Sequence, residues 1–183
     1  MKYQSIDLEK KAAYTVAELM AAAAKTAPKA CGIDNVETVV LDGKEKDDLT
    51  VEMRKIAKDP WADFFKRDAA NVDSSHCIVL IGVKDSPIGT PGRDFCGLCG
   101  LSDCAETKKV GARCAFNIAD LGIAVGSAVS IAADHRIDNR ILFSAGMAAL
   151  SIGVFPKDVK TCFGIPLSTS SKNIFFDRDS TLP

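Results

Sequence analysis

The run His76-Cys-Ile-Val-Leu-Ile-Gly-Val83 decides the fold, because it is apolar without interruption after its first residue. A strand with one solvated face alternates apolar and polar residues, whereas a strand buried on both faces reads as a continuous apolar run. Layers of helices must then cover both faces of the sheet that contains it. We therefore predict a central strand here, enclosed between helices.

Further elements are predicted on either side of this strand from composition and periodicity. Before it, the sequence predicts helices over residues 7–26, 48–58 and 61–70 and a β-branched strand over 36–42. After it, the sequence predicts helices over 115–133 and 138–153 and strands over 159–165 and 173–177. Asp138 is the expected N-cap of the second of these helices, and Pro166 is expected to end the first strand. This order predicts an α/β (α+β) sandwich with a small mixed or antiparallel sheet covered by helices.

Two groups of apolar side chains carry specific expectations. Trp61, Phe64 and Phe65 are expected to anchor the core beneath the third helix. The helix over 115–133 is apolar nearly all round, which indicates a place in the core or in a subunit interface. Its glycines at 122 and 126 would let another helix or a cofactor approach its backbone.

The totals exclude several classes of protein. The 183 residues suit a single domain, 1–183, and 23 basic residues stand against 24 acidic ones, interspersed along the chain. A net charge of −1 predicts no nucleic-acid-binding surface. The N-terminal residues lack the apolar region of a signal peptide, and the stretch from Ala115 is interrupted by Asn117, Asp120 and Asp134. We expect a cytoplasmic protein that does not enter a membrane.

Four of the seven cysteines lie within one loop. Cys96, Cys99, Cys104 and Cys114 have the spacing C-x2-C-x4-C-x9-C, and a Pro/Gly-rich stretch over 85–93 leads to them. They are too close together to close useful disulfide loops, so the pattern indicates metal or redox chemistry. The segment 84–114 is therefore predicted to be an inserted cysteine-rich loop, since a long loop in a compact domain is usually functional.

The cysteine spacing favours a [4Fe–4S] cluster. Gly97 and Gly100 suit a tight turn that leaves backbone N–H groups free to point at sulfur, and Lys108, Lys109 and Arg113 would offset the cluster's negative charge. Zinc is the alternative metal, although structural zinc sites usually combine two Cys-x2-Cys pairs or cysteine with histidine. A third alternative is that the four loop cysteines bind no metal and are free or disulfide-bonded. The other three cysteines, Cys31, Cys77 and Cys162, are interpreted as buried packing residues.

Four motifs resemble the family of uncharacterised proteins that contain a ferredoxin domain. They are Cys96-Gly-Leu-Cys-Gly-x3-Cys104, Asp120-Leu-Gly-Ile-Ala-x-Gly-Ser-Ala, Arg136-x-Asp-Asn-Arg140 and Gly164-Ile-Pro-Leu-Ser followed by Lys172-Asn-Ile-x-Phe-Asp-Arg178. The resemblance runs along nearly the whole chain. It implies a cluster and, by itself, no defined activity.

A more distant resemblance links the chain to the FMN-dependent nitroreductases. Residues 22–32 and the strand that follows are similar to the helix, Ala-Pro turn and strand that open that fold, and residues 120–133 and 151–166 are similar to its central helix and its Gly-Tyr-Pro strand. The resemblance implies a nitroreductase-like fold and a homodimer that holds FMN at the subunit interface. The cysteine loop would then be an insertion in the middle of this fold.

The same resemblance nominates residues for the flavin. Lys29, which stands where the nitroreductases have a serine, would lie near the isoalloxazine or the phosphate. Arg136, Arg140, Lys172 or Arg178 would supply charge to the phosphate. The basic opening that grips the phosphate in nitroreductases is replaced here by an acidic segment over residues 3–9.

Three functions follow as hypotheses. The first is an oxidoreductase that combines the cluster with FMN, and the second is a cluster-binding electron carrier or redox sensor without flavin. The third is a zinc-stabilised structural protein. Neither His76 nor His135 makes a catalytic pattern, and the sequence names no catalytic residue, substrate, redox partner or small-molecule acceptor.

Overall fold

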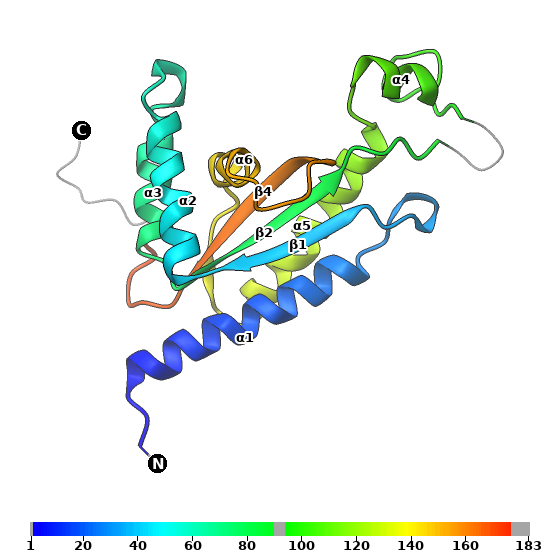
Figure 1. Ribbon diagram of the computed structural model, residues 1–183. Helices are drawn as coiled ribbons and strands as arrows, with labels where there is room; N and C mark the ends of the chain where they lie inside the picture. Colours follow the sequence, from blue (N-terminus) through cyan, green and yellow to red (C-terminus); the bar gives the residue numbers. More distant parts are fainter. Residues whose placement is uncertain (1, 90–93, 177–183) are drawn as a thin grey trace.

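The chain folds as one four-stranded antiparallel sheet between helices (Figure 1). The computed structural model describes residues 2–89 and 94–176. In chain order the elements are α1 (Ser5–Thr26), η1 (Ala30–Gly32), β1 (Val36–Leu41), α2 (Gly43–Ile56), η2 (Pro60–Ala62), α3 (Phe65–Asp73), β2 (Cys77–Lys84), α4 (Cys104–Val110), α5 (Ala115–Asp134), β3 (Asp138–Asn139), α6 (Phe143–Ser151) and β4 (Val159–Ser168). The strand order is β1-β2-β4-β3, and every pairing is antiparallel. The predicted α+β sandwich with a small sheet is confirmed.

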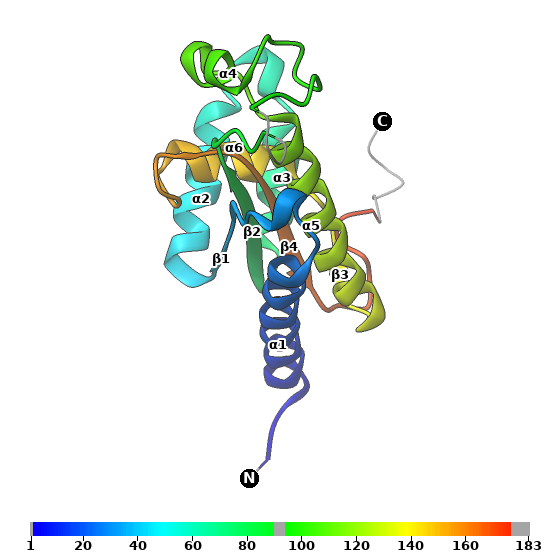
Figure 2. The ribbon, with the colours of Figure 1, turned by 90° about the vertical axis from the view of Figure 1, so that its right-hand side faces the viewer.

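The central strand β2 buries both of its faces, as its sequence predicted. Cys77, Val79, Ile81 and Val83 belong to the core shared with α1 and α5, whereas Ile78 and Leu80 belong to the core shared with α2, α3 and α6. Successive side chains of a strand point to opposite faces, so an apolar run supplies both cores at once. The two ribbon views agree that these two sets of helices cover opposite faces of the sheet (Figures 1 and 2).

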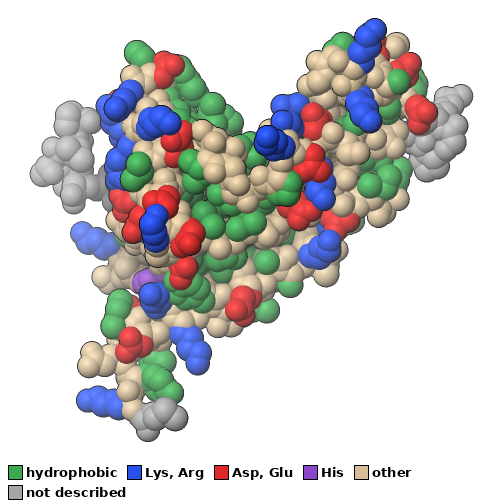
Figure 3. All heavy atoms as spheres, in the orientation of Figure 1, with side chains coloured by type: hydrophobic (Ala, Val, Ile, Leu, Met, Phe, Trp, Pro, Cys, Tyr) green, Lys and Arg blue, Asp and Glu red, His purple; other side chains and the backbone are tan. Residues whose placement is uncertain are grey.

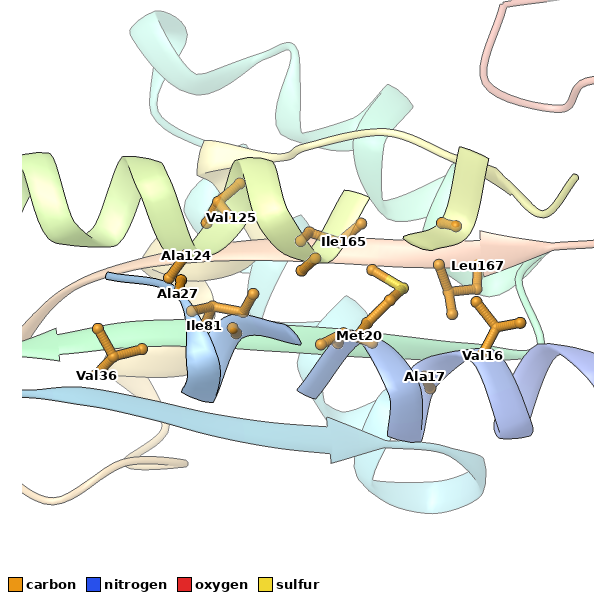
Figure 4. Packing of buried hydrophobic residues seen from close by; sticks show 14 of the residues in the cluster. Val16, Ala17, Met20, Ala27, Val36, Ile81, Ala124, Val125, Ile165 and Leu167 are labelled. Atoms are coloured by element: carbon orange, nitrogen blue, oxygen red, sulfur yellow. The ribbon is translucent and has the colours of Figure 1, made fainter. Parts of the chain in front are cut away.

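Small residues let α1 and α5 pack closely on the sheet. Met20 of α1 is fully buried beside Ile165 and Leu167 of β4 (Figure 4). Six of the ten buried residues that α1 and α5 contribute to this core are alanines. By length and composition α5 is apolar enough to cross a membrane. Here one of its faces packs instead against α1 and the sheet, so its hydropathy is that of a core helix with one exposed side.

On the opposite face, α6 crosses β4 at glycine positions. A Cβ atom added at Gly146 would lie 1.9 Å from the carbonyl oxygen of Cys162, and one added at Gly164 would lie 2.7 Å from the Cβ of Ala145. Both distances are far below van der Waals contact. The crossing therefore requires glycine at both positions.

The aromatic anchors expected in the third helix are only partly correct. Phe65 is fully buried, but Trp61 and Phe64 are 54% and 39% exposed. Trp61 lies edge-on to Phe65, with ring centroids 5.9 Å apart, at the tip of the α2–α3 hairpin. This tip rises beyond the sheet, where none of the described elements covers it (Figure 1). The expectation was wrong for Trp61 and Phe64 because the helix starts only at Phe65.

Other elements also differ from the sequence prediction. α2 begins at Gly43, and α6 begins at Phe143. Residues 138–139, expected to start that last helix, pair with β4 instead, so Asp138 is a strand residue and not an N-cap. Within the described chain, residues 173–176 form a turn and not a strand.

β4 continues through Pro166 to Ser168. Gly164 exchanges both of its backbone hydrogen bonds with Leu142 on the β3 side of the strand. Backbone groups alternate sides along a strand, so the nitrogen of Pro166 points toward the β3 side, as the backbone of Gly164 does. On that side β3 pairs only with Leu167 and Ser168 and not with Pro166. The missing N–H of proline is tolerated there, and the expected strand end was wrong for this reason.

Candidate metal centre

The cysteine loop leaves the body at the end of β2 and returns at the start of α5 (Figure 1). Cys96 and Cys99 lie in its turns, Cys104 is the first residue of α4, and Cys114 immediately precedes α5. Cys114 is 5% exposed, and the other three are partly exposed. The loop stands opposite the α2–α3 hairpin across a hollow with a largely apolar floor (Figure 3).

Polar contacts close the loop at its root. The amide of Asn117, in the first turn of α5, donates to the carbonyls of Lys84 at 3.1 Å and Ser86 at 2.7 Å. Its oxygen accepts from the side chain of Asn35 at 3.0 Å. These bonds join the outgoing strand end, the returning helix and the segment before β1. In the sequence, Asn117 was only an interruption of an apolar helix. A polar amide at such a position was the one sign that it makes specific hydrogen bonds.

A salt bridge adds to this closure. Arg113 Nη1 lies 2.8 Å from Asp85 Oδ2, across the two ends of the loop. The charge expected from Arg113 for a cluster is therefore balanced by Asp85. Lys108 and Lys109, in the last turn of α4, are exposed.

α4 is a short helix that the sequence reading did not predict. The Asp103 carboxylate accepts from the backbone N–H of Glu106 at 2.7 Å. The Glu106 carboxylate in turn accepts from the backbone N–H of Ser102 at 2.8 Å and from its hydroxyl at 2.6 Å. Gly111 closes the other end in the left-handed conformation, at φ 68°. Asp103-x-x-Glu106 is a variant of the capping box, so the signal was present.

Gly97 and Gly100 have φ values of 78° and 77°, so the turns around Cys96 and Cys99 use the positive φ that these glycines were expected to provide. Residues other than glycine rarely adopt this backbone conformation.

The four thiols differ in their surroundings. Burial raises the pKa of the Cys104 thiol, and the nearby charges of Cys114, Cys96 and Asp94 raise it further. Cys96 and Cys114 therefore each lie within electrostatic range of Cys104. A hydrogen bond from the Thr107 side chain lowers the pKa of Cys99, and the backbone N–H of Leu101 adds to this effect.

The donor set fits a soft metal centre in its chemistry. All seven cysteines are free thiols, and four of them share one loop with a closed root. Within residues 2–89 and 94–176, no three His, Cys, Asp or Glu side chains lie close enough together to hold a metal ion. A [4Fe–4S] cluster instead takes one thiolate at each of its four irons, so its ligands need not converge on a single ion.

The other three cysteines fall into two kinds. Cys77 and Cys162 are buried in the sheet, and burial raises the pKa of each thiol to about 12, as suits packing residues. Cys31 is exposed, with a left-handed φ of 55° in η1. The packing interpretation was wrong for Cys31, because the turn after α1 projects it away from both cores.

Lys29, nominated for the flavin, already uses its ammonium to bind carbonyl groups at the C-terminal end of α1. Its ammonium donates to the carbonyls of Ala24, Lys25 and Ala27 at 3.0, 2.7 and 2.9 Å, and its side chain is 5% exposed. Last-turn carbonyls of a helix have no partner within the helix, and a lysine is a common cap for them. Next to it, the N–H of Ala30 donates to both carboxylate oxygens of Asp120, at 3.0 and 3.1 Å, a partly buried contact that the sequence did not predict.

The remaining basic candidates lie elsewhere. Arg140 donates to the carbonyl of Phe175 at 3.2 Å and stacks over the ring of Phe176. Arg136 and Lys172 are exposed, and Arg178 lies outside the described residues. Ala30, the residue after Lys29, binds Asp120 near the start of α5, whereas Arg136 follows the end of that helix, about 20 Å further along its axis. A single chain therefore does not bring Lys29 and Arg136 to one phosphate.

A groove of about 670 Å³ lies between the start of α1 and the segment after β4. Hydroxyls of residues 168–171 and of Ser74 line it, together with Glu9 and His76, whose Nε2 lies 2.9 Å from Thr169 Oγ1. Among the described lining residues there is one carboxylate and no lysine or arginine. The groove of one chain thus offers hydroxyls but no cation to a phosphate.

Comparison with known proteins identifies the family. The profile of a family described as uncharacterised proteins containing a ferredoxin domain matches residues 110–178, a segment that includes Cys114 and begins after the other three loop cysteines. An uncharacterised protein of Archaeoglobus fulgidus is 40% identical over 181 residues, covering 94% of this chain and 95% of that protein. The chain belongs to this ferredoxin-domain family.

Solved structures show that the family member has a nitroreductase-like fold. A nitroreductase with bound FMN from Desulfitobacterium hafniense DCB-2 superposes with a TM-score of 0.59 at 14% identity, covering 92% of this chain and 82% of that one. A BluB-like flavoprotein from Clostridium difficile 630 gives a TM-score of 0.56 at 15% identity, covering 100% and 87%. The suspected family and its distant nitroreductase resemblance are both confirmed. Family and fold together support a redox role.

Proposed function

We propose that the protein is an iron–sulfur redox protein that carries a [4Fe–4S] cluster on Cys96, Cys99, Cys104 and Cys114. The observation that carries the proposal is a loop with four free thiols, closed at its root and attached to a nitroreductase-like body. When bound, such a cluster supplies one-electron exchange at a potential set by hydrogen bonds and nearby charge. The protein's part is to hold that centre and to set its potential.

The chain's own residues support this role in three ways. Asn117 and the Asp85–Arg113 pair hold the two ends of the loop together. Gly97 and Gly100 adopt the turns that leave backbone donors available near Cys96 and Cys99. Cys114 sits at the N-terminus of α5, a twenty-residue helix whose free amides and dipole stabilise nearby negative charge.

FMN is proposed only for a homodimer. One chain places Lys29 and the groove residues apart, and its groove has no cation, so the residues of one chain do not fit the phosphate. The exposed face of α5 is the proposed dimer contact. It includes Ile118, Ala119, Gly122, Ile123 and Gly126 and bears no charged residue before its last turn. An electron carrier or redox sensor without flavin is the second candidate, favoured by Glu9 in the groove.

The free thiols favour a reducing compartment, so the cytoplasm is the proposed location. The even balance of charge favours neither nucleic acid nor a membrane surface as a partner. The redox partner and any small-molecule acceptor are left open by these residues.

Cysteine variants test the proposal. Cys99→Ser should abolish the visible absorbance of anaerobically purified protein, because it removes one of four thiolate ligands. Cys31→Ser is the matched control: it replaces an exposed cysteine outside the loop and should leave the spectrum unchanged. Equal spectra for Cys99→Ser and the wild type would contradict the assignment. Soaking with FMN, followed by gel filtration, tests the flavin: retained flavin supports the dimeric oxidoreductase, and unbound flavin supports the carrier.

A further inference from the structure

Thr107 is the single buried residue of α4, at 1% exposed, on a helix whose other residues are exposed or partly exposed. Its hydroxyl lies 3.4 Å from the sulfur of Cys99 and 3.0 Å from the carbonyl of Asp103. A threonine hydroxyl has one proton to donate and can accept through two lone pairs. Its two neighbours therefore compete for that proton.

The carbonyl of Asp103 does not depend on this hydroxyl. It also accepts the backbone N–H of Thr107 at 3.1 Å, the ordinary bond of the helix. When Cys99 is a thiol, its own S–H can donate to the Thr107 oxygen. When Cys99 is a metal-bound thiolate it carries no proton, so the contact is a hydrogen bond only if Thr107 donates to sulfur.

We infer that Thr107 is a positioning residue that donates a hydrogen bond to the Cys99 sulfur in the cluster-bound protein and thereby raises the reduction potential. The inference rests on the proposed function and concerns the regulation of its potential. Reduction takes one electron from an external one-electron donor, and the added negative charge falls partly on the cysteine sulfurs. A hydrogen bond from the Thr107 hydroxyl to the sulfur is stronger in that more negative, reduced state, so it favours reduction. The proton stays on the Thr107 oxygen throughout.

Three variants of the reconstituted full-length protein test this inference in a redox titration with sodium dithionite. Thr107→Val keeps the shape and removes the hydroxyl. Thr107→Ser keeps the hydroxyl. Thr15→Val is the matched control, because Thr15 makes the same bond to the carbonyl four residues back, to Lys11 at 3.1 Å, on the distant helix α1.

We expect Thr107→Val to lower the reduced-to-oxidised ratio at a fixed solution potential by about threefold to tenfold, where tenfold equals 59 mV for one electron. Thr107→Ser and Thr15→Val should titrate as the wild type does. If Thr107→Val loses its cluster or its fold while Thr107→Ser keeps the cluster at the wild-type potential, the hydroxyl is again the cause and the inference stands.

Two results would overturn the inference. One is an unshifted potential in Thr107→Val that retains its cluster, and the other is a serine variant that behaves like the valine variant. Iron content separates this failure from failure of the proposed function. A wild-type protein that takes up no iron overturns both, whereas wild-type iron with an unshifted valine variant overturns only the role of Thr107.

Discussion

In the body of the sandwich, β2 buries side chains on both faces, whereas in the cysteine loop α4 buries only Thr107. The body is ordered by close apolar contact, down to glycines that permit backbone approach at Gly146. The loop is ordered by helix caps and by the polar contacts of Asn117 and Arg113 at its root. A change in the body should therefore act on global stability, and a change at the root should act on the loop. Three substitutions test this difference.

Gly146→Ala should have the largest effect. The new Cβ would lie 1.9 Å from the carbonyl oxygen of Cys162, so α6 must move off β4. We expect a loss of about 3 kcal/mol or more in the free energy of unfolding, measured by urea denaturation. Val51→Ala is the control: Val51 is 65% exposed on α2, so helix propensity alone should change the stability, by less than about 1 kcal/mol in the stabilising direction. Equal stabilities for the two variants would contradict the close packing described for α6.

Asn117→Ala should have an intermediate effect, concentrated in the loop. It removes the donor to the carbonyls of Lys84 and Ser86 and the acceptor for Asn35. Leaving such groups unpaired costs about 1–3 kcal/mol. Limited proteolysis should cut within 84–114 faster than in the wild type, before the body unfolds. Unchanged cleavage of the loop would show that its root is held by other contacts.

Arg113→Ala should have the smallest effect. Its side chain is 45% exposed, and exposed salt bridges contribute about 0.2–1 kcal/mol. The same proteolysis assay should show a slight increase in loop cleavage, and the increase should shrink further in high salt. A larger effect than that of Asn117→Ala would reverse the ranking of the two root contacts.

The body was more predictable than the loop because its signals are repetitive. The apolar run of β2 and the alanines of α1 are periodic, so the helix, strand and sandwich followed from them. α4 was missed because it rests on the reciprocal caps of Asp103 and Glu106 and has almost no apolar face. The expectation that Pro166 ends the strand was wrong for a similar reason. Whether a proline interrupts a sheet depends on whether its nitrogen faces a paired neighbour strand, which the sequence alone does not show.

The candidate site was predictable in its chemistry but not in its arrangement. Cysteine spacing identified the four thiols, whereas the contact of Thr107 with Cys99 depends on how α4 folds back on the loop. The role of Lys29 as a helix cap likewise depends on the path of the chain after α1. The spacing of residues in the sequence identifies which side chains could bind a metal or a phosphate. Tertiary contacts decide which of those side chains are already bonded to other groups of the protein.

The four loop cysteines are proposed to hold an iron–sulfur cluster. The most direct test is one analysis of iron, acid-labile sulfide and zinc in wild-type protein expressed and purified without oxygen. The account predicts about four irons and four sulfides per chain and little zinc. One zinc per chain, with no iron or sulfide, would contradict it and would make the loop a structural zinc site.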